Sequence, residues 1–301
     1  MIDSFAPVNP KLIDVFPKVH DGYPDKLAAQ DTPDVLVEAC GSASRSFPKS
    51  LYVEPKRWAE VARENDRNKT WPVNFIDRFT NQNPTHECTW HSGTRVIEGA
   101  RNRQLGIIFP EGPKKNFRYE ESKRGSVWLS PMSGYNEANP RIRGGASIQS
   151  VISIGCRRGV LPDKIQPRDY GLKHTMPGTQ GKGNMNQSHG DWVSVANMPD
   201  GWEETAKWFK PLEVCIIEDI EQAVSLLLNG FLVGVGRNGH AVPWAQLTFR
   251  GDDIATAPYP DSYDLVRYDS FNTMRSAARG AFCVLSVTAP DDWLKPAGGA
   301  A

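Results

Sequence analysis

Residues 81–90 read NQNPTHECTW, and this stretch decides the fold that the sequence predicts. Gln82 stands six residues before Cys88. A cysteine that attacks a carbonyl needs hydrogen-bond donors for the oxyanion that forms. A side-chain amide just ahead of the nucleophile supplies one donor, and the backbone N–H of the cysteine supplies another. We therefore expect Gln82 as oxyanion donor and Cys88 as nucleophile, with a buried structural cysteine as the alternative.

The position of Cys88 also suits a reactive thiol. Asn83 and Pro84 favour a turn, so a helix is predicted to begin at Cys88 and to run through Arg101. The N-terminus of a helix lowers a thiol pKa through its dipole and its unpaired N–H groups. Glu87 opposes this effect if its carboxylate faces the sulfur.

Composition excludes several classes of partner. The 301 residues carry 35 Lys and Arg against 35 Asp and Glu, a formal net charge of zero. This balance argues against nucleic acid or an anionic membrane as partner, and no apolar run reaches the length of a membrane span. The first residues, MIDSFAPVNPKLIDVF, lack the pattern of a secretory signal. Five widely spaced cysteines favour a reducing compartment, so we expect a cytoplasmic or virion-associated protein.

The chain divides into a Pro-rich, polar N-terminal extension (residues 1–70) and a domain spanning residues 71–300. Helices dominate the first part of the domain, to about residue 190, and strands dominate residues 191–300, which predicts an α+β protein with two lobes. Helices are expected at 55–65, 147–156 and 217–228, strands at 105–109, 231–235, 245–249 and 282–287, and a loop at 171–190.

At this point the sequence resembles the papain family of cysteine peptidases. The family carries the same spacing as Gln82 and Cys88, and Ile-Glu-Gly at 97–99 is similar to its central helix. Gly-His-Ala-Val at 239–242 resembles its histidine motif, and Asp-Ser-Phe at 269–271 is similar to its Asn-Ser-Trp. The resemblance runs from about residue 72 to 287 and keeps the order of the family's motifs.

The resemblance implies a helical left lobe, a β-barrel right lobe and a site between them. His240 would be the acid/base partner of Cys88, and Asp269 would orient the imidazole. Asp269 stands where the family has asparagine, and Asn272 is the fallback for the same role. No cofactor or metal is implied, and the substrate would be a peptide or protein chain.

A metal site is the competing reading of one motif. His86, Cys88 and His91 form His-x-Cys-x-x-His, but no second cluster completes four ligands. Metal binding is therefore the weaker interpretation, and no metal is predicted.

Two other functions stay open beside a cysteine peptidase. The same residues suit a peptidoglycan-cleaving amidase or endopeptidase. Glu87 beside the thiol motivates a non-enzymatic alternative, in which the fold is a structural or binding component of a large assembly such as a phage particle, held by neighbouring subunits.

Overall fold

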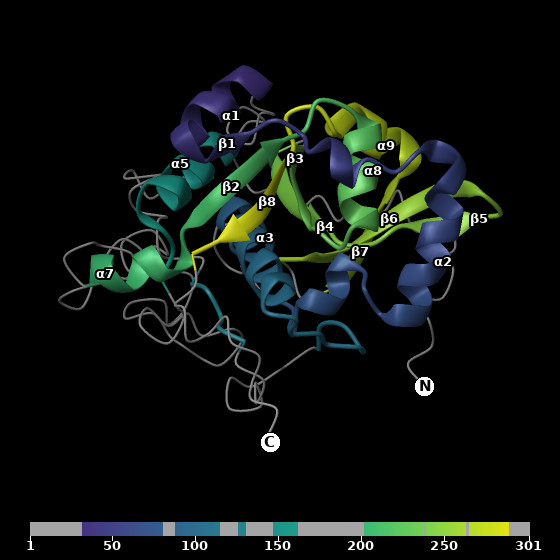
Figure 1. Ribbon diagram of the computed structural model, residues 1–301, viewed down its shortest axis with the longest axis horizontal. Helices are drawn as coiled ribbons and strands as arrows, with labels where there is room; N and C mark the ends of the chain where they lie inside the picture. Colours follow the sequence, from purple (N-terminus) through teal and green to yellow (C-terminus); the bar gives the residue numbers. More distant parts are fainter. Residues whose placement is uncertain are drawn as a thin grey trace, which may run out of the picture.

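The computed structural model describes residues 32–80, 88–114, 126–130, 147–161, 202–237, 239–262 and 265–288 (Figure 1). The helices are α1 (Pro33–Cys40), α2 (Trp58–Asn68), α3 (Cys88–Gln104), α5 (Ile148–Arg158), α7 (Trp202–Ala206), α8 (Ile220–Leu228) and α9 (Phe271–Ala277). Short 3-10 helices are η2 (Gly41–Ala43), η3 (Lys49–Leu51), η4 (Pro55–Arg57), η5 (Pro72–Phe75) and η8 (Lys207–Phe209). The strands are β1 (Ser44–Arg45), β2 (Pro211–Ile216), β3 (Val233–Arg237), β4 (His240–Trp244), β5 (Thr248–Arg250), β6 (Asp253–Asp261), β7 (Leu265–Ser270) and β8 (Phe282–Val287).

The strands form two sheets. The first has the order β1-β2-β8-β3-β4, and the second has the order β5-β6-β7. β1 runs parallel to β2, and the other pairs are antiparallel. A backbone hydrogen bond from Ala245 N–H to the carbonyl of Pro258 (3.2 Å) joins the end of the first sheet to the second. Helices precede this strand-rich half, which confirms the predicted α+β class.

Helix α3 is the centre of the molecule. Its residues are buried from Cys88 to Asn102, and it packs against β4, β8 and α5 (Figure 1). Two glycines permit this close approach. A Cβ on Gly93 would lie 2.6 Å from Val151 of α5, and a Cβ on Gly99 would lie 1.9 Å from Leu232.

The end of α3 explains why the strand predicted at 105–109 is wrong. Gly106 has φ 67°, its N–H donates to the carbonyl of Arg103 (3.1 Å), and the N–H of Ile107 donates to the carbonyl of Asn102 (2.8 Å). These two bonds form a Schellman motif, which satisfies the last carbonyls of the helix. The apolar run therefore belongs to a helix cap and to the segment after it, not to a sheet.

Residues 32–70 pack onto the remainder of the fold. α1 contacts α5, β1 pairs with β2, and α2 contacts α8. Asn65 donates a hydrogen bond to the carbonyl of Leu228 (2.8 Å), and Val53 N–H bonds to Ser225 Oγ (3.1 Å). Both contacts join this segment to α8. The helix α8 itself was predicted from the amphipathic pattern of residues 217–228.

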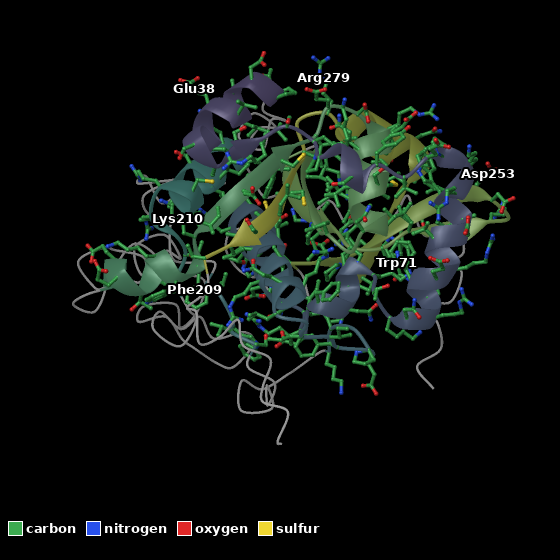
Figure 2. The ribbon with its side chains drawn as sticks, in the orientation of Figure 1. Glu38, Trp71, Phe209, Lys210, Asp253 and Arg279 are labelled. Carbon is green, nitrogen blue, oxygen red and sulfur yellow. The ribbon has the colours of Figure 1, made fainter. Side chains whose placement is uncertain are left out.

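The core is continuous across both lobes. Trp71 and Phe209, far apart in sequence, are each 2% exposed, whereas Glu38, Asp253 and Arg279 lie at the surface (Figure 2). Of the remaining predicted elements, 147–156 matches α5 and 282–287 matches β8, and 245–249 is the link from β4 into β5. The loop expected at 171–190 lies outside the described residues. Within the described ranges, no helix is long and apolar enough to span a membrane.

Candidate active site

Cys88 is the first residue of α3, as the sequence predicts. Its side chain is 5% exposed, and its sulfur lies 3.9 Å from the hydroxyl of Thr89. Burial by itself would raise the pKa of the thiol. The adjacent imidazole of His240 outweighs burial, with help from the backbone of Ala241 and from Thr89, so the pKa of Cys88 falls below its usual value. The thiol is therefore poised to ionise.

His240 is brought to Cys88 by a tight hairpin. Arg237 and His240 face each other at the ends of β3 and β4, so the loop between them is the two residues Asn238-Gly239. Gly239 has φ 76°, a left-handed conformation that favours glycine in such turns. β4 packs against α3 and so carries the imidazole within hydrogen-bonding reach of the Cys88 thiol.

The imidazole is engaged on two sides. Its Nε2 lies 2.8 Å from Oδ1 of Asp261, which leaves Nδ1 as the other polar atom of the ring. Burial lowers the pKa of His240, but Asp261 and Cys88 together raise it to about 10. A lowered thiol pKa beside a raised imidazole pKa favours a thiolate–imidazolium pair.

Asp261 takes the position that the sequence assigned to Asp269. It is the last residue of β6, and its carboxylate is fully buried. Burial raises its pKa, whereas His240 and Arg267 lower it, and the lowering prevails, so the carboxylate is ionised at neutral pH. The geometric expectation for Asp269 is therefore corrected: Asp261 is the residue hydrogen-bonded to the imidazole.

Asp269 has other partners. It accepts a hydrogen bond from Trp244 Nε1 (2.8 Å) and forms a 2.7 Å ion pair with Arg237. Burial raises its pKa, against the lowering influence of Arg237. Asp269 thus links β7 to β3 and β4 beside the candidate site. Asn272, the fallback, is exposed on α9.

The sequence contains the signal for the correct aspartate. Within the strand-rich half, residues 191–300, the pattern Asp-Ser-aromatic occurs twice, as Asp-Ser-Tyr at 261–263 and as Asp-Ser-Phe at 269–271. Both copies resemble Asn-Ser-Trp equally well. Only the path of β6 and β7 selects the first copy, because its aspartate ends β6 next to the start of β4.

Other predicted residues bear on the site differently. Gln82 and Glu87 lie outside the described residues, so the oxyanion role of Gln82 stays a prediction. His91 is buried within α3. Among the described residues, no group of three or more His, Cys, Asp or Glu side chains is arranged to hold a metal ion.

A buried ionic network anchors α3 below the site. Glu98, from the Ile-Glu-Gly stretch, contacts Arg95 at 2.7 Å and Arg78 at 3.4 Å and accepts a hydrogen bond from Leu129 N–H (2.5 Å). Burial raises the pKa of Glu98 despite both arginines. Arg78 also lies over the ring of Trp128, 3.8 Å from its centroid. The network fixes the helix whose first residue is Cys88.

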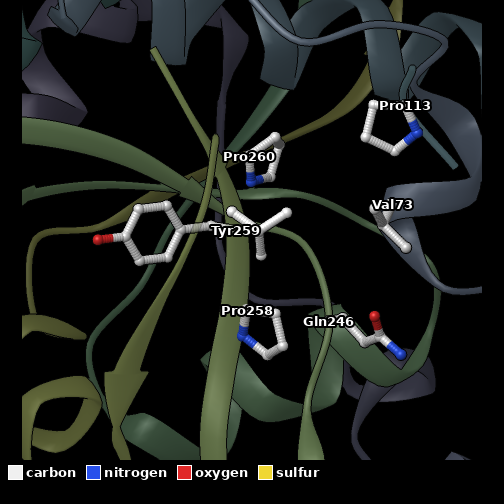
Figure 3. A pocket seen from close by; sticks show the side chains of 7 residues that line it. Val73, Pro113, Gln246, Pro258, Tyr259 and Pro260 are labelled. Carbon is white, nitrogen blue, oxygen red and sulfur yellow. The ribbon is translucent and has the colours of Figure 1, made fainter. Parts of the chain in front are cut away.

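An apolar hollow on β6 is separate from the site. Val73, Pro113 and Gln246 line it together with Pro258 and Pro260 of β6 (Figure 3). Successive strand residues point to opposite faces, so these prolines and Asp261 lie on opposite faces of β6. Neither Cys88 nor His240 is among the residues that line the hollow.

The fold has counterparts among solved structures. Xylellain, a cysteine protease from Xylella fastidiosa, is 14% identical, with 83% of this chain and 92% of that chain covered at a TM-score of 0.53. ProCathepsin B S9 from Trypanosoma congolense is 10% identical, with 93% and 98% covered at a TM-score of 0.50. No family profile and no curated protein matches the sequence. At these identities the likeness is one of fold, and the chain has the papain-like fold that its sequence predicts.

Proposed function

We propose that this chain is a cysteine peptidase in which Cys88 is the nucleophile, His240 the acid/base group and Asp261 the residue that orients the imidazole. The observation that carries the proposal is the alignment of a helix-terminal thiol, an imidazole and a buried carboxylate, with the His240–Asp261 contact at 2.8 Å. Pairing of a cysteine with a histidine that a third group orients is the arrangement that activates a thiol for attack on a carbonyl. The substrate we propose is a peptide or protein chain.

The residues suit the two halves of an acyl transfer. The Cys88 thiolate attacks the peptide carbonyl, and the tetrahedral oxyanion receives hydrogen bonds from the Cys88 backbone N–H and, as the sequence predicts, from Gln82. His240 then donates its proton to the leaving amine as the C–N bond breaks, which leaves a thioester on Cys88. In the second half, His240 removes a proton from water, the hydroxyl group adds to the thioester, and the thiol leaves.

Labelling by an epoxide-type thiol inhibitor tests the proposal. Under native conditions, peptide mapping is expected to find the label on Cys88. Cys215 and Cys283 are internal controls, because burial raises the pKa of each, to about 12 for Cys215. Labelling of these two thiols while Cys88 stays unmodified would refute the proposal.

Turnover gives the second test. A mixture of unstructured proteins is incubated with the native chain and with Cys88→Ala, and new amino termini are counted by mass spectrometry. New termini with the native chain alone support peptidase activity. Loss of turbidity of bacterial walls, without cleavage of proteins, would instead identify a peptidoglycan hydrolase.

A further inference from the structure

Each oxygen of the Asp261 carboxylate faces one charged or titrating side chain, and the hydroxyl of Ser262 also donates to Oδ1 at 3.3 Å. Oδ1 faces Nε2 of His240 at 2.8 Å, and Oδ2 lies 2.6 Å from Nε of Arg267. The second contact is an ion pair without the directionality of a hydrogen bond. The Asp261 side chain is fully buried and that of Arg267 is 22% exposed, so the pair is shielded from water on the carboxylate side.

The pairing of β6 with β7 builds this contact. Tyr259 faces Arg267 and Asp261 faces Leu265 across the two antiparallel strands. Arg267 is therefore the diagonal neighbour of Asp261 on the same face of the sheet. A long side chain spans this diagonal.

An aspartate in this place needs a counter-charge. The resemblance predicts a neutral asparagine behind the histidine, and a neutral amide can be buried without a cation. A buried carboxylate loses hydration that must be replaced by hydrogen bonds or by an opposite charge. His240 offers a positive charge only while it is protonated, whereas an arginine is always charged.

We propose that Arg267 is a positioning residue of this site: its guanidinium holds the carboxylate of Asp261 in place behind His240 and takes up part of its negative charge. The catalytic consequence rests on the proposed peptidase function. The electrostatic consequence is independent of that function, because the pKa of His240 can be measured in a variant without activity.

Two effects follow from sharing the carboxylate. Asp261 stays ionised throughout the catalytic cycle, including the step in which His240 has given up its proton. The imidazolium is also less strongly stabilised than it would be by an unshared carboxylate, so it releases its proton to the leaving amine more readily.

Other charged groups surround the contact and stay constant in the experiment. Asp269 of β7 and Arg237 of β3 form their own ion pair, and Tyr259 of β6 is hydrogen-bonded to Arg237. Among the described residues, Cys88 is the other titrating group, besides Asp261, that contacts the imidazole. It is removed by working in a Cys88→Ala background, so that the thiol no longer titrates together with His240.

The test is an NMR titration of His240 with labelled histidine in Cys88→Ala, with and without Arg267→Met. Loss of the positive charge on the far side of the Asp261 carboxylate is expected to raise the pKa of His240 by about one pH unit. Arg267→Lys, which keeps the charge, is expected to restore most of the original value. Arg275→Met removes an exposed arginine of α9 and is expected to leave the pKa of His240 unchanged.

The outcomes are decisive in both directions. An unchanged or lowered pKa of His240 in folded Arg267→Met overturns the proposal, as does a Lys variant that behaves like the Met variant. If the Met variant does not fold, Arg267→Gln takes its place, with the same expected rise.

In the protein with intact Cys88, the alkaline limb of kcat/KM is expected to move upward while KM is unchanged. Absence of any turnover would refute the peptidase function and leave the titration result standing.

Discussion

Replacing Asp261 by asparagine is expected to dismantle the thiolate–imidazolium pair, whereas the same change at Asp269 is expected to leave the pair largely intact. Both aspartates are buried and lie eight residues apart, in identical Asp-Ser-aromatic patterns. They differ in their partners, because Asp261 contacts the imidazole of His240 and Asp269 contacts Arg237 and Trp244. The comparison therefore isolates the role of the carboxylate behind His240.

The magnitude follows from the pKa of His240. Its rise from 6.5 to about 10 corresponds to about 5 kcal/mol in favour of the protonated ring, at ~1.4 kcal/mol for each pKa unit. The contact with Asp261 is the largest of the causes that raise it. Losing that charge is therefore expected to lower the pKa of His240 by about two units. The pKa of the Cys88 thiol rises in response, since it loses the cation that stabilises the thiolate.

Two measurements follow the pair. The ultraviolet absorbance of the thiolate, recorded against pH with Cys88→Ala as blank, gives the ionisation of Cys88. The rate of alkylation by iodoacetamide at neutral pH gives its reactivity, which is expected to fall about tenfold in Asp261→Asn. For peptide hydrolysis, Asp261→Ala removes orientation as well as charge and is expected to lower kcat/KM by ~10²–10⁴-fold.

The refuting result is a reversal of the two aspartates. If Asp269→Asn abolishes the thiolate signal while Asp261→Asn keeps it, with both proteins folded by circular dichroism, Asp261 does not orient the imidazole. Asp269→Asn is expected to cost stability instead, because it leaves Arg237, whose side chain is 11% exposed, without a full counter-charge.

Three further outcomes test the site and its scaffold. Activity is expected to rise with pH as Cys88 ionises at its lowered pKa, and to fall as His240 deprotonates near pH 10. By linkage, the stability that protonated His240 contributes is complete below pH 6.5 and is lost as pH rises towards 10. Urea unfolding at several pH values measures this loss. Glu98→Ala leaves two buried arginines without their shared carboxylate and is expected to lower the free energy of unfolding by about 3–5 kcal/mol. Gly99→Ala places a Cβ 1.9 Å from a core leucine and is expected to lower the free energy of unfolding by about 1–3 kcal/mol, measured by thermal unfolding. Gly155→Ala, with no neighbour closer than 3.8 Å, is expected to be tolerated. Equal losses of stability in the two variants would contradict the packing of α3.

Elements with strong local signals were predictable from the sequence. α3 begins at Cys88, and α8 follows an amphipathic pattern that ends before Asn229-Gly230. The strand predicted from the apolar run at 105–109 was wrong, because periodicity cannot distinguish a short strand from the apolar segment that follows a helix cap. Gly106 within that run was the local sign of the cap, and its positive φ bears this out.

The third member of the candidate site was not predictable in the same way. The residues around Cys88 predict its place at the start of a helix, and the Gly-His stretch predicts that His240 begins a strand. Asp261 and Asp269 have the same local sequence, so no local argument separates them.

Local sequence was therefore enough to place a thiol at the start of a helix and a histidine at the start of a strand in the strand-rich half. Those placements depend on turns and helix ends, which are encoded within a few residues. The three-dimensional packing was needed to show which carboxylate contacts the imidazole and that Arg267 contacts that carboxylate. These contacts join three strands, β4, β6 and β7, and their partners are fixed by strand register and by how the β5-β6-β7 sheet packs against β4 of the other sheet.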